Sequence, residues 1–128
     1  MTSMPVVHAD GRTLTPQEVA MVAQQKATVA VSEDAWPAIH AARRVVDRIV
    51  SEGETVYGIN TGFGALVHAR ISADDLAQLQ VNLIRSHATA IGDLMGIEAV
   101  RAMMLIRLNS LCKGHSGIHP DCIRQLVL

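Results

Sequence analysis

A glycine-rich stretch holds the residues whose types and spacing can do chemistry, because it contains the only tyrosine and the only phenylalanine of the chain. Glycine accepts positive φ and lets a main chain approach another group closely, which is why glycine-rich loops often hold ligands. A tyrosine there can act as a general base. A free phenol has a pKa of about 10, so its anion needs donors such as the N–H groups of the loop. Alternatively, the hydroxyl only anchors the loop. The stretch is Val56-Tyr57-Gly58-Ile59-Asn60-Thr61-Gly62-Phe63-Gly64-Ala65-Leu66.

The glycines that follow the tyrosine have two compatible interpretations. Gly62 and Gly64 can serve turn geometry alone. They can also leave room for a ligand beside Tyr57, since neither has a side chain. We therefore keep both interpretations open.

His87 is the second candidate residue. It follows Leu83 by four positions, on the apolar face of an expected helix. A lone histidine on such a face usually fills a core position, but the ring can also hydrogen-bond a polar ligand.

A metal site is the rival chemistry. The segment Cys112 to Cys122 offers Cys-x2-His-x3-His-x2-Cys through His115 and His119, and soft nitrogen and sulfur ligands at short spacing can bind zinc. The order is unusual for a zinc module, and Cys112 falls within an expected helix. The pair Asp74-Asp75 is explained better by helix capping than by acid–base chemistry.

A small α+β lobe must position the glycine-rich stretch. The apolar run Pro5–His8 and the alternating run 28–31 predict short strands, and Asp10-Gly11 predicts a hairpin tip or a loop. Thr15-Pro16-Gln17-Glu18 predicts a capping box that opens a helix to about Gln25. A second helix begins at Ser32 or Asp34 and ends at Gly53.

Three further helices are expected after the loop. Ser72 caps the first, whose apolar face runs to Ile91 before Gly92 ends it. The second carries an apolar stripe and ends at Lys113 and Gly114, and Pro120 opens the third. We predict a mainly α fold, with an N-terminal lobe over residues 1–70 and the first helices of a central helical domain over 71–128. The stripe of the second helix is Ile97, Val100, Met104, Leu108 and Leu111.

Composition limits the partners. The chain of 128 residues is 49% hydrophobic and only 18% charged, against about 25% charged in typical domains. Its apolar surface therefore needs a covering partner.

A net charge of −1 without a basic stripe argues against nucleic acid. No apolar run of about 18 residues and no signal-like N-terminus occur, which argues against a membrane. Two cysteines without a disulfide framework suit the cytoplasm.

The glycine-rich stretch and two later blocks together resemble the aromatic amino acid ammonia-lyases, that is, the histidine, tyrosine and phenylalanine lyases with related aminomutases. The pattern is closest to the histidine lyases, and it covers the chain clearly from about Thr55. The later blocks are Leu79-Gln80-Val81-Asn82-Leu83-Ile84-Arg85-Ser86-His87-Ala88 and Arg107-Leu108-Asn109-Ser110-Leu111-Cys112-Lys113-Gly114-His115-Ser116-Gly117.

The resemblance implies an enzyme of which this chain is an N-terminal portion. The family forms a methylidene-imidazolone group from an internal Ala-Ser-Gly triplet, which this sequence lacks and which would lie beyond Leu128. The resemblance also implies a cytoplasmic homotetramer, a bundle shared between its subunits, and no metal. The chain alone is then inactive and depends on the rest of its polypeptide.

The resemblance also assigns roles to residues. Tyr57 matches the base that takes the β-proton of an aromatic L-amino acid, and Gly64 matches a position beside the substrate. Ser86 and His87 match the position where members of the family recognise the substrate ring. The ring of His87 and the hydroxyl of Tyr57 should therefore border one cavity. L-Histidine, giving urocanate, is the first choice, and a tyrosine lyase or aminomutase is the alternative. A non-catalytic fragment or a small metal-binding domain is the alternative of another class. Other polar residues of the blocks more simply fix helix ends and subunit contacts: Asn82, Arg85, Arg107 and Asn109.

Overall fold

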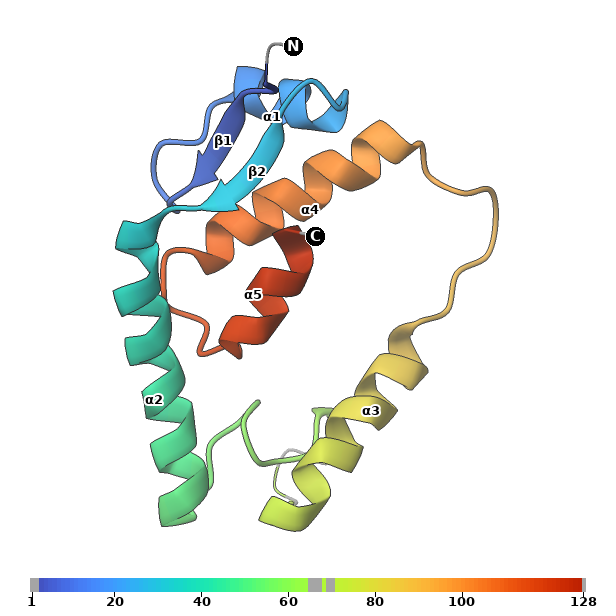
Figure 1. Ribbon diagram of the computed structural model, residues 1–128. Coiled ribbons are helices and arrows are strands. Elements are labelled where there is room, and N and C mark those ends of the chain that lie inside the picture. Colours follow the sequence, from blue (N-terminus) through green and yellow to red (C-terminus); the bar gives the residue numbers. More distant parts are fainter. Residues whose placement is uncertain (1–2, 65–67, 69–70, 128) are drawn as a thin grey trace. The chain divides into compact units, whose positions relative to one another are not determined.

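The computed structural model describes residues 3–64, 68 and 71–127. They form two compact units: the first comprises the chain up to Val45 and from Leu94 onward, and the second runs from Val46 to Asp93. The elements are mainly helices, with one small sheet (Figure 1). The predicted fold class is confirmed.

A two-stranded parallel sheet begins the first unit. β1 (Val6–Ala9) pairs with β2 (Thr28–Val31), and the register places Val6 opposite Thr28. Parallel strands need a crossover connection rather than a tight hairpin, and α1 (Pro16–Ala23) lies in that crossover. Asp10 and Gly11 are therefore the loop between β1 and α1.

The start of α1 has the capping box that its sequence predicts. The Thr15 hydroxyl oxygen accepts the Glu18 N–H (3.3 Å), and the Glu18 carboxylate accepts the Thr15 N–H (2.8 Å). The helix ends slightly before the predicted Gln25, because Gln25 has a φ of 59°, in the left-handed region. This reversal leads the chain into β2.

α2 (Trp36–Glu52) follows a short 3-10 turn, η1 (Glu33–Ala35), and ends before Gly53, which has a φ of 72°. This end was predicted. Its first turns belong to the first unit, where Ile39 is buried, and its last turns belong to the second.

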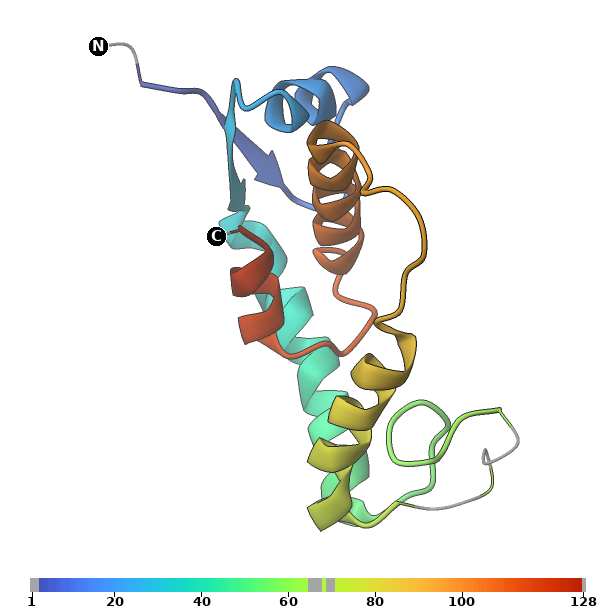
Figure 2. The same cartoon turned by 90° about the vertical axis from the view of Figure 1, so that its right-hand side faces the viewer.

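α4 (Ile97–Leu111) is the central helix of the first unit, and α5 (Pro120–Val127) packs against it. Both views show α4 beside α1 (Figures 1 and 2). The predicted stripe of α4 is wrong in its N-terminal half, because Ile97, Val100 and Met104 are exposed. α4 carries apolar residues on nearly every side, so periodicity does not identify its inner face. Its buried residues are Leu105, Leu108 and Leu111.

The second unit contains α3 (Leu76–His87), which follows the 3-10 turn η3 (Ala73–Asp75). The predicted cap at Ser72 is present, since its hydroxyl oxygen accepts the Asp75 N–H (3.3 Å). None of the residues of α3 is buried. Leu76, Leu79 and Leu83 are partly buried, and the other residues of α3 are exposed.

α3 was predicted to run to Ile91, and this is wrong, because it ends at His87. The side chains of Ser86 and His87 both bond the Leu83 carbonyl oxygen, and such bonds compete with helix continuation. The segment 88–96 is exposed throughout, so no packing stabilises another turn.

Candidate active site

Tyr57 begins a tight turn in the second unit. The Val56 carbonyl oxygen accepts the N–H groups of Ile59 (3.1 Å) and Asn60 (3.3 Å), which closes the turn. Gly58, with a φ of 79°, supplies the left-handed residue that this turn needs. Tyr57 is 62% exposed, whereas Asn60 is 3% exposed. The turn thus exposes the phenol of Tyr57 to solvent, while the side chain of Asn60 is buried beneath it.

Phe63 lies beside Tyr57 after the turn. The two ring centroids are 6.1 Å apart, and the planes meet at 67°, an edge-to-face arrangement. Gly62 is buried and Gly64 is exposed, with a φ of 57°. A Cβ added at Gly64 would meet nothing within 4 Å. Gly64 therefore has a left-handed backbone and borders open space, and its place beside a substrate stays a prediction. Ala65 and Leu66, the end of the predicted loop, lie outside the described residues.

His87 and Ser86 form one polar group at the C-terminal end of α3. The Ser86 hydroxyl donates to the Leu83 carbonyl oxygen (2.9 Å), and His87 Nδ1 lies 2.9 Å from the same oxygen. In the tautomer that donates from Nδ1 to this carbonyl oxygen, Nε2 is an acceptor. The ring is exposed, so it does not fill a core position in this unit.

The structure brings Ser86 to His87 and Phe63 to Tyr57, but no cavity described here joins Tyr57 with His87. A cavity of the second unit, about 330 Å³, lies between the start of α3 and the segment before it. The shared border of the Tyr57 hydroxyl and the His87 ring stays a prediction. The lining residues of this cavity are Ile71, Ser72, Asp75, Gln78, Leu79 and Asn82.

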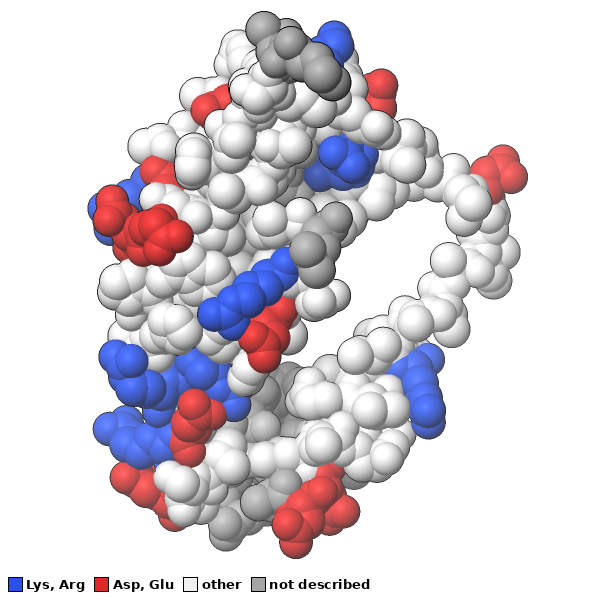
Figure 3. Space-filling view, viewed as in Figure 1, with Lys and Arg blue, Asp and Glu red and all other residues white. Residues whose placement is uncertain are grey.

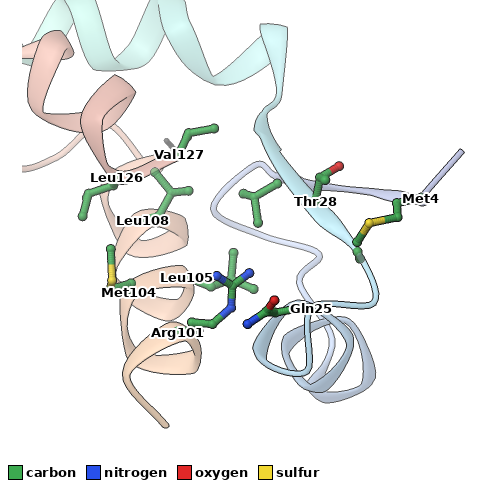
Figure 4. A pocket seen from close by; sticks show the side chains of 11 residues that line it. Met4, Gln25, Thr28, Arg101, Met104, Leu105, Leu108, Leu126 and Val127 are labelled. Atoms are coloured by element: carbon green, nitrogen blue, oxygen red, sulfur yellow. The ribbon is translucent and has the colours of Figure 1, made fainter. Parts of the chain in front are cut away.

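A cavity of about 380 Å³ in the first unit lies between β2, α4 and α5 (Figure 4). Its walls are mostly apolar, with Leu105 and Leu108 among them, and Arg101 is its charged side chain. Arg101 Nε donates to the Val22 carbonyl oxygen (3.1 Å). None of the predicted site residues lines this cavity, and its one cation already serves a structural bond.

The candidate metal ligands are not brought together. In the described part of the chain, no three His, Cys, Asp or Glu side chains are placed to hold a metal ion. Cys112 is buried and Cys122 is exposed. Burial raises the pKa of the Cys112 thiol to about 11, and the negative charge of Asp10 adds to this. A neutral thiol is a poor metal ligand.

Surface charge follows the mixed pattern of the sequence. Along α2, Arg side chains lie beside Asp and Glu side chains on the face shown (Figure 3). One pair is Arg48 and Glu52, 3.9 Å apart. Across residues 3–64, 68 and 71–127, no helix is both long and apolar enough to cross a membrane.

Polar residues of the later blocks include helix-fixing groups. Asn109, near the end of α4, accepts the Gly11 N–H (2.8 Å) and so ties the loop after β1 to that helix. Asn82 accepts the side-chain amide of Gln78 (2.8 Å) on α3. Asn60 had no predicted role, although asparagine within a glycine-rich turn often hydrogen-bonds its own backbone.

Comparison with known proteins places these features in one family. A sequence model described as "Aromatic amino acid lyase" matches residues 14–128. The chain is 48% identical over 122 residues to the histidine ammonia-lyase of Streptococcus pyogenes serotype M5 (strain Manfredo), and the match covers 95% of this chain and 24% of that protein.

Solved structures agree. The histidine ammonia-lyase from Trypanosoma cruzi is 42% identical with a TM-score of 0.87, over 95% of this chain and 24% of that one. The tyrosine aminomutase from Streptomyces globisporus is 34% identical with a TM-score of 0.89, over 96% and 23%. The chain thus spans about a quarter of the length of these relatives. Because the match covers nearly all of this chain, it belongs to the aromatic amino acid lyase family.

Proposed function

We propose that this chain is part of a carbon–nitrogen lyase that converts L-histidine to urocanate and ammonia. The observation that carries the proposal is the 48% identity to a histidine ammonia-lyase over 95% of the chain. The complete lyase, meaning this chain with the polypeptide that would follow residue 128, is proposed to act in histidine catabolism as a cytoplasmic homotetramer. The chain by itself is proposed to be inactive.

Tyr57 is the proposed base for the β-proton of the substrate. Its ring projects from a turn that a buried Asn60 underlies, and its exposure leaves the hydroxyl accessible. Open space beside Gly58 and Gly64 leaves room for a substrate. In this geometry the chain binds the substrate beside Tyr57, and the phenol, once ionised, takes one proton on its oxygen.

The methylidene-imidazolone group of the family would supply an electrophile on the amine side of the substrate. This chain lacks the Ala-Ser-Gly triplet that forms the group. The features of this chain that fit such a group are the accessible phenol of Tyr57 and the open space beside Gly64, which has no side chain. These features fit a substrate held between Tyr57 and a group from elsewhere in the protein.

His87 is proposed to recognise the substrate ring by a hydrogen bond, supported by Ser86. With Nδ1 bonded to the Leu83 carbonyl oxygen, Nε2 can accept a hydrogen bond. The imidazole N–H of histidine and the hydroxyl of tyrosine can both donate one, and the phenyl ring of phenylalanine cannot. His87 therefore favours polar rings without choosing between them.

The test is an ultraviolet assay of the complete lyase with histidine, tyrosine and phenylalanine, following each unsaturated acid. We expect the highest kcat/KM for histidine. The 128-residue chain is the matched control, and it should show no turnover. Preference for another amino acid would contradict the substrate, and turnover by the chain alone would contradict the need for the missing triplet.

The second candidate is a tyrosine lyase or aminomutase. It is favoured by the TM-score of 0.89 to the tyrosine aminomutase from Streptomyces globisporus. The same assay tests its substrate, because tyrosine would then give the highest kcat/KM. Chromatography of the products tests for an aminomutase, which would yield a β-amino acid in addition to the unsaturated acid.

A further inference from the structure

We infer that Asn60 is a positioning residue for the base. The inference rests on the proposed role of Tyr57 and adds a residue to it. Asn60 is 3% exposed, although it lies in a loop whose tyrosine is 62% exposed. A buried amide in a short loop has to satisfy both of its polar groups within the protein.

Both ends of the Asn60 amide bond the chain just before Tyr57. Oδ1 accepts the Val56 N–H (2.9 Å), and Nδ2 donates to the Glu54 carbonyl oxygen. These two hydrogen bonds, which we call the clip, hold the segment that enters the turn. The residue before the tyrosine is therefore held directly.

The main chain of Asn60 closes the other side of the turn. Its N–H donates to the Val56 carbonyl oxygen (3.3 Å), and its carbonyl oxygen accepts the Ile71 N–H (2.9 Å). The two backbone groups of Val56 therefore both bond Asn60, one to its side chain and one to its main chain. Asn60 is the point where three stretches of the second unit meet.

This arrangement sets the direction in which Tyr57 points. Tyr57 is 62% exposed and meets the Phe63 ring only edge to face, so the hydrogen bonds of Asn60 fix the Cα–Cβ bond of Tyr57 more than packing does. A general base must lie within hydrogen-bond reach of the proton that it removes. Loss of the clip should therefore lower the rate of proton transfer more than the binding of substrate.

No smaller side chain can replace the amide fully. Asn60→Ala leaves the Val56 N–H and the Glu54 carbonyl oxygen without this partner. Asn60→Asp has the same shape and keeps an acceptor for Val56, but it cannot donate to Glu54. The aspartate turns an oxygen toward the Glu54 carbonyl oxygen, whereas the alanine leaves that oxygen without this partner. Both variants therefore break the clip in different ways, and one keeps the test available where the other does not fold.

The experiment is a double-mutant cycle in the complete lyase, with kcat and KM measured for histidine. The four proteins are wild type, Asn60→Ala, Tyr57→Phe and the double variant, with Asn60→Asp and Ser51→Ala beside them. Ser51 lies in the same unit, and its hydroxyl donates to the Arg48 carbonyl oxygen (2.8 Å) at the exposed end of α2. It is the control for loss of one local hydrogen bond.

We expect Asn60→Ala to lower kcat by about 10²-fold, the cost of misplacing a reacting group by about 1 Å, with little change in KM. Asn60→Asp should also lower kcat, because it loses the bond to Glu54, and Ser51→Ala should lose nothing. In the Tyr57→Phe background, Asn60→Ala should cost nothing further, because it acts through the phenol.

Two results would overturn the inference alone. One is an equal loss from Asn60→Ala in both backgrounds, which indicates a purely structural role. The other is normal turnover of Asn60→Ala beside an impaired Tyr57→Phe variant. If instead Tyr57→Phe turns over normally, the proposed base fails, and this inference fails with it.

Discussion

Two glycines of the first unit differ from two glycines of the second in what surrounds them. In the first unit, a Cβ at Gly114 would lie 2.6 Å from the backbone of Ala38, and one at Gly11 would lie 2.8 Å from the backbone N of Lys113. In the second unit, a Cβ at Gly58 or Gly64 would meet nothing within 4 Å. All four have positive φ. The first pair permits close packing, and the second pair shapes an open loop.

The same contrast extends to the side chains. The first unit holds an apolar core that joins the sheet to the helices, with Leu108 and Ile123 nearly inaccessible. In the second unit, α3 buries none of its residues, and the turn at Tyr57 is closed by hydrogen bonds of Asn60. One region is therefore specified by packing, and the region that carries the proposed chemistry is specified by local polar contacts.

Gly114→Ala should be the most damaging glycine substitution. Its left-handed backbone costs about 1–3 kcal/mol for a residue with a Cβ, and overpacking against Ala38 adds about 1–3 kcal/mol. Gly58→Ala should cost only the backbone part, about 1–3 kcal/mol. Thermal unfolding midpoints of the two variants make the comparison. Equal losses would show that close packing at Gly114 contributes nothing.

His87→Phe should change specificity with little change in stability, because the ring is exposed at the end of α3. In the complete lyase, kcat/KM for histidine and tyrosine should fall about tenfold to a hundredfold, as expected for a lost hydrogen bond of about 1.5–3 kcal/mol. Phenylalanine turnover should change little. A uniform fall for all three amino acids would remove the specificity role.

The two cysteines report on the packed region. With its pKa raised to about 11 by burial, Cys112 keeps its proton at pH 8, whereas exposed Cys122 should be alkylated readily. Mass spectrometry of the 128-residue chain after iodoacetamide should find one label. Gly58→Ala should keep this pattern, and Gly114→Ala should expose Cys112. Labelling of Cys112 in the Gly58→Ala variant would contradict the separation of the two regions.

The smallest effect concerns acid stability of the loop after β1. The Thr13 hydroxyl and the N–H groups of Thr13 and Arg12 donate to the Asp10 carboxylate, and they lower its pKa to about 2. A carboxylate whose pKa is lowered on folding stabilises the fold at pH values above 3.8, the usual pKa of the group. This contribution is lost as the pH falls toward 2. Unfolding midpoints of wild type and Asp10→Asn should therefore converge between about pH 4 and pH 2. A gap that stays constant through this range would contradict the shift.

Sequence patterns predicted the features that depend on neighbouring residues. The capping box of Thr15 and Glu18, the cap at Ser72 and the helix ends at Gly53 and Gly114 are present. Each rests on a backbone requirement that a few adjacent residues meet. The division of the chain after residue 70 stays a prediction for the complete lyase.

Features that depend on distant packing, or on side-chain bonds that compete with a regular pattern, were not predictable in the same way. The inner face of α4 is chosen by its contacts with α1 and β1, since its apolar residues lie on nearly every side. α3 ends early because Ser86 and His87 bond the carbonyl oxygen of Leu83. The proposed role of Asn60 was not predicted, because it rests on the hydrogen bonds of this residue to Glu54, Val56 and Ile71.

The most direct test of the central claim is the turnover of histidine by Tyr57→Phe in the complete lyase. The change removes one hydroxyl from an exposed ring and keeps the edge contact with Phe63, so the fold and assembly should match wild type. The account predicts that kcat falls by at least about 10²–10⁴-fold, the contribution of a positioned general base. Near-normal kcat in a correctly folded variant would contradict it and reduce Tyr57 to an anchor of the loop.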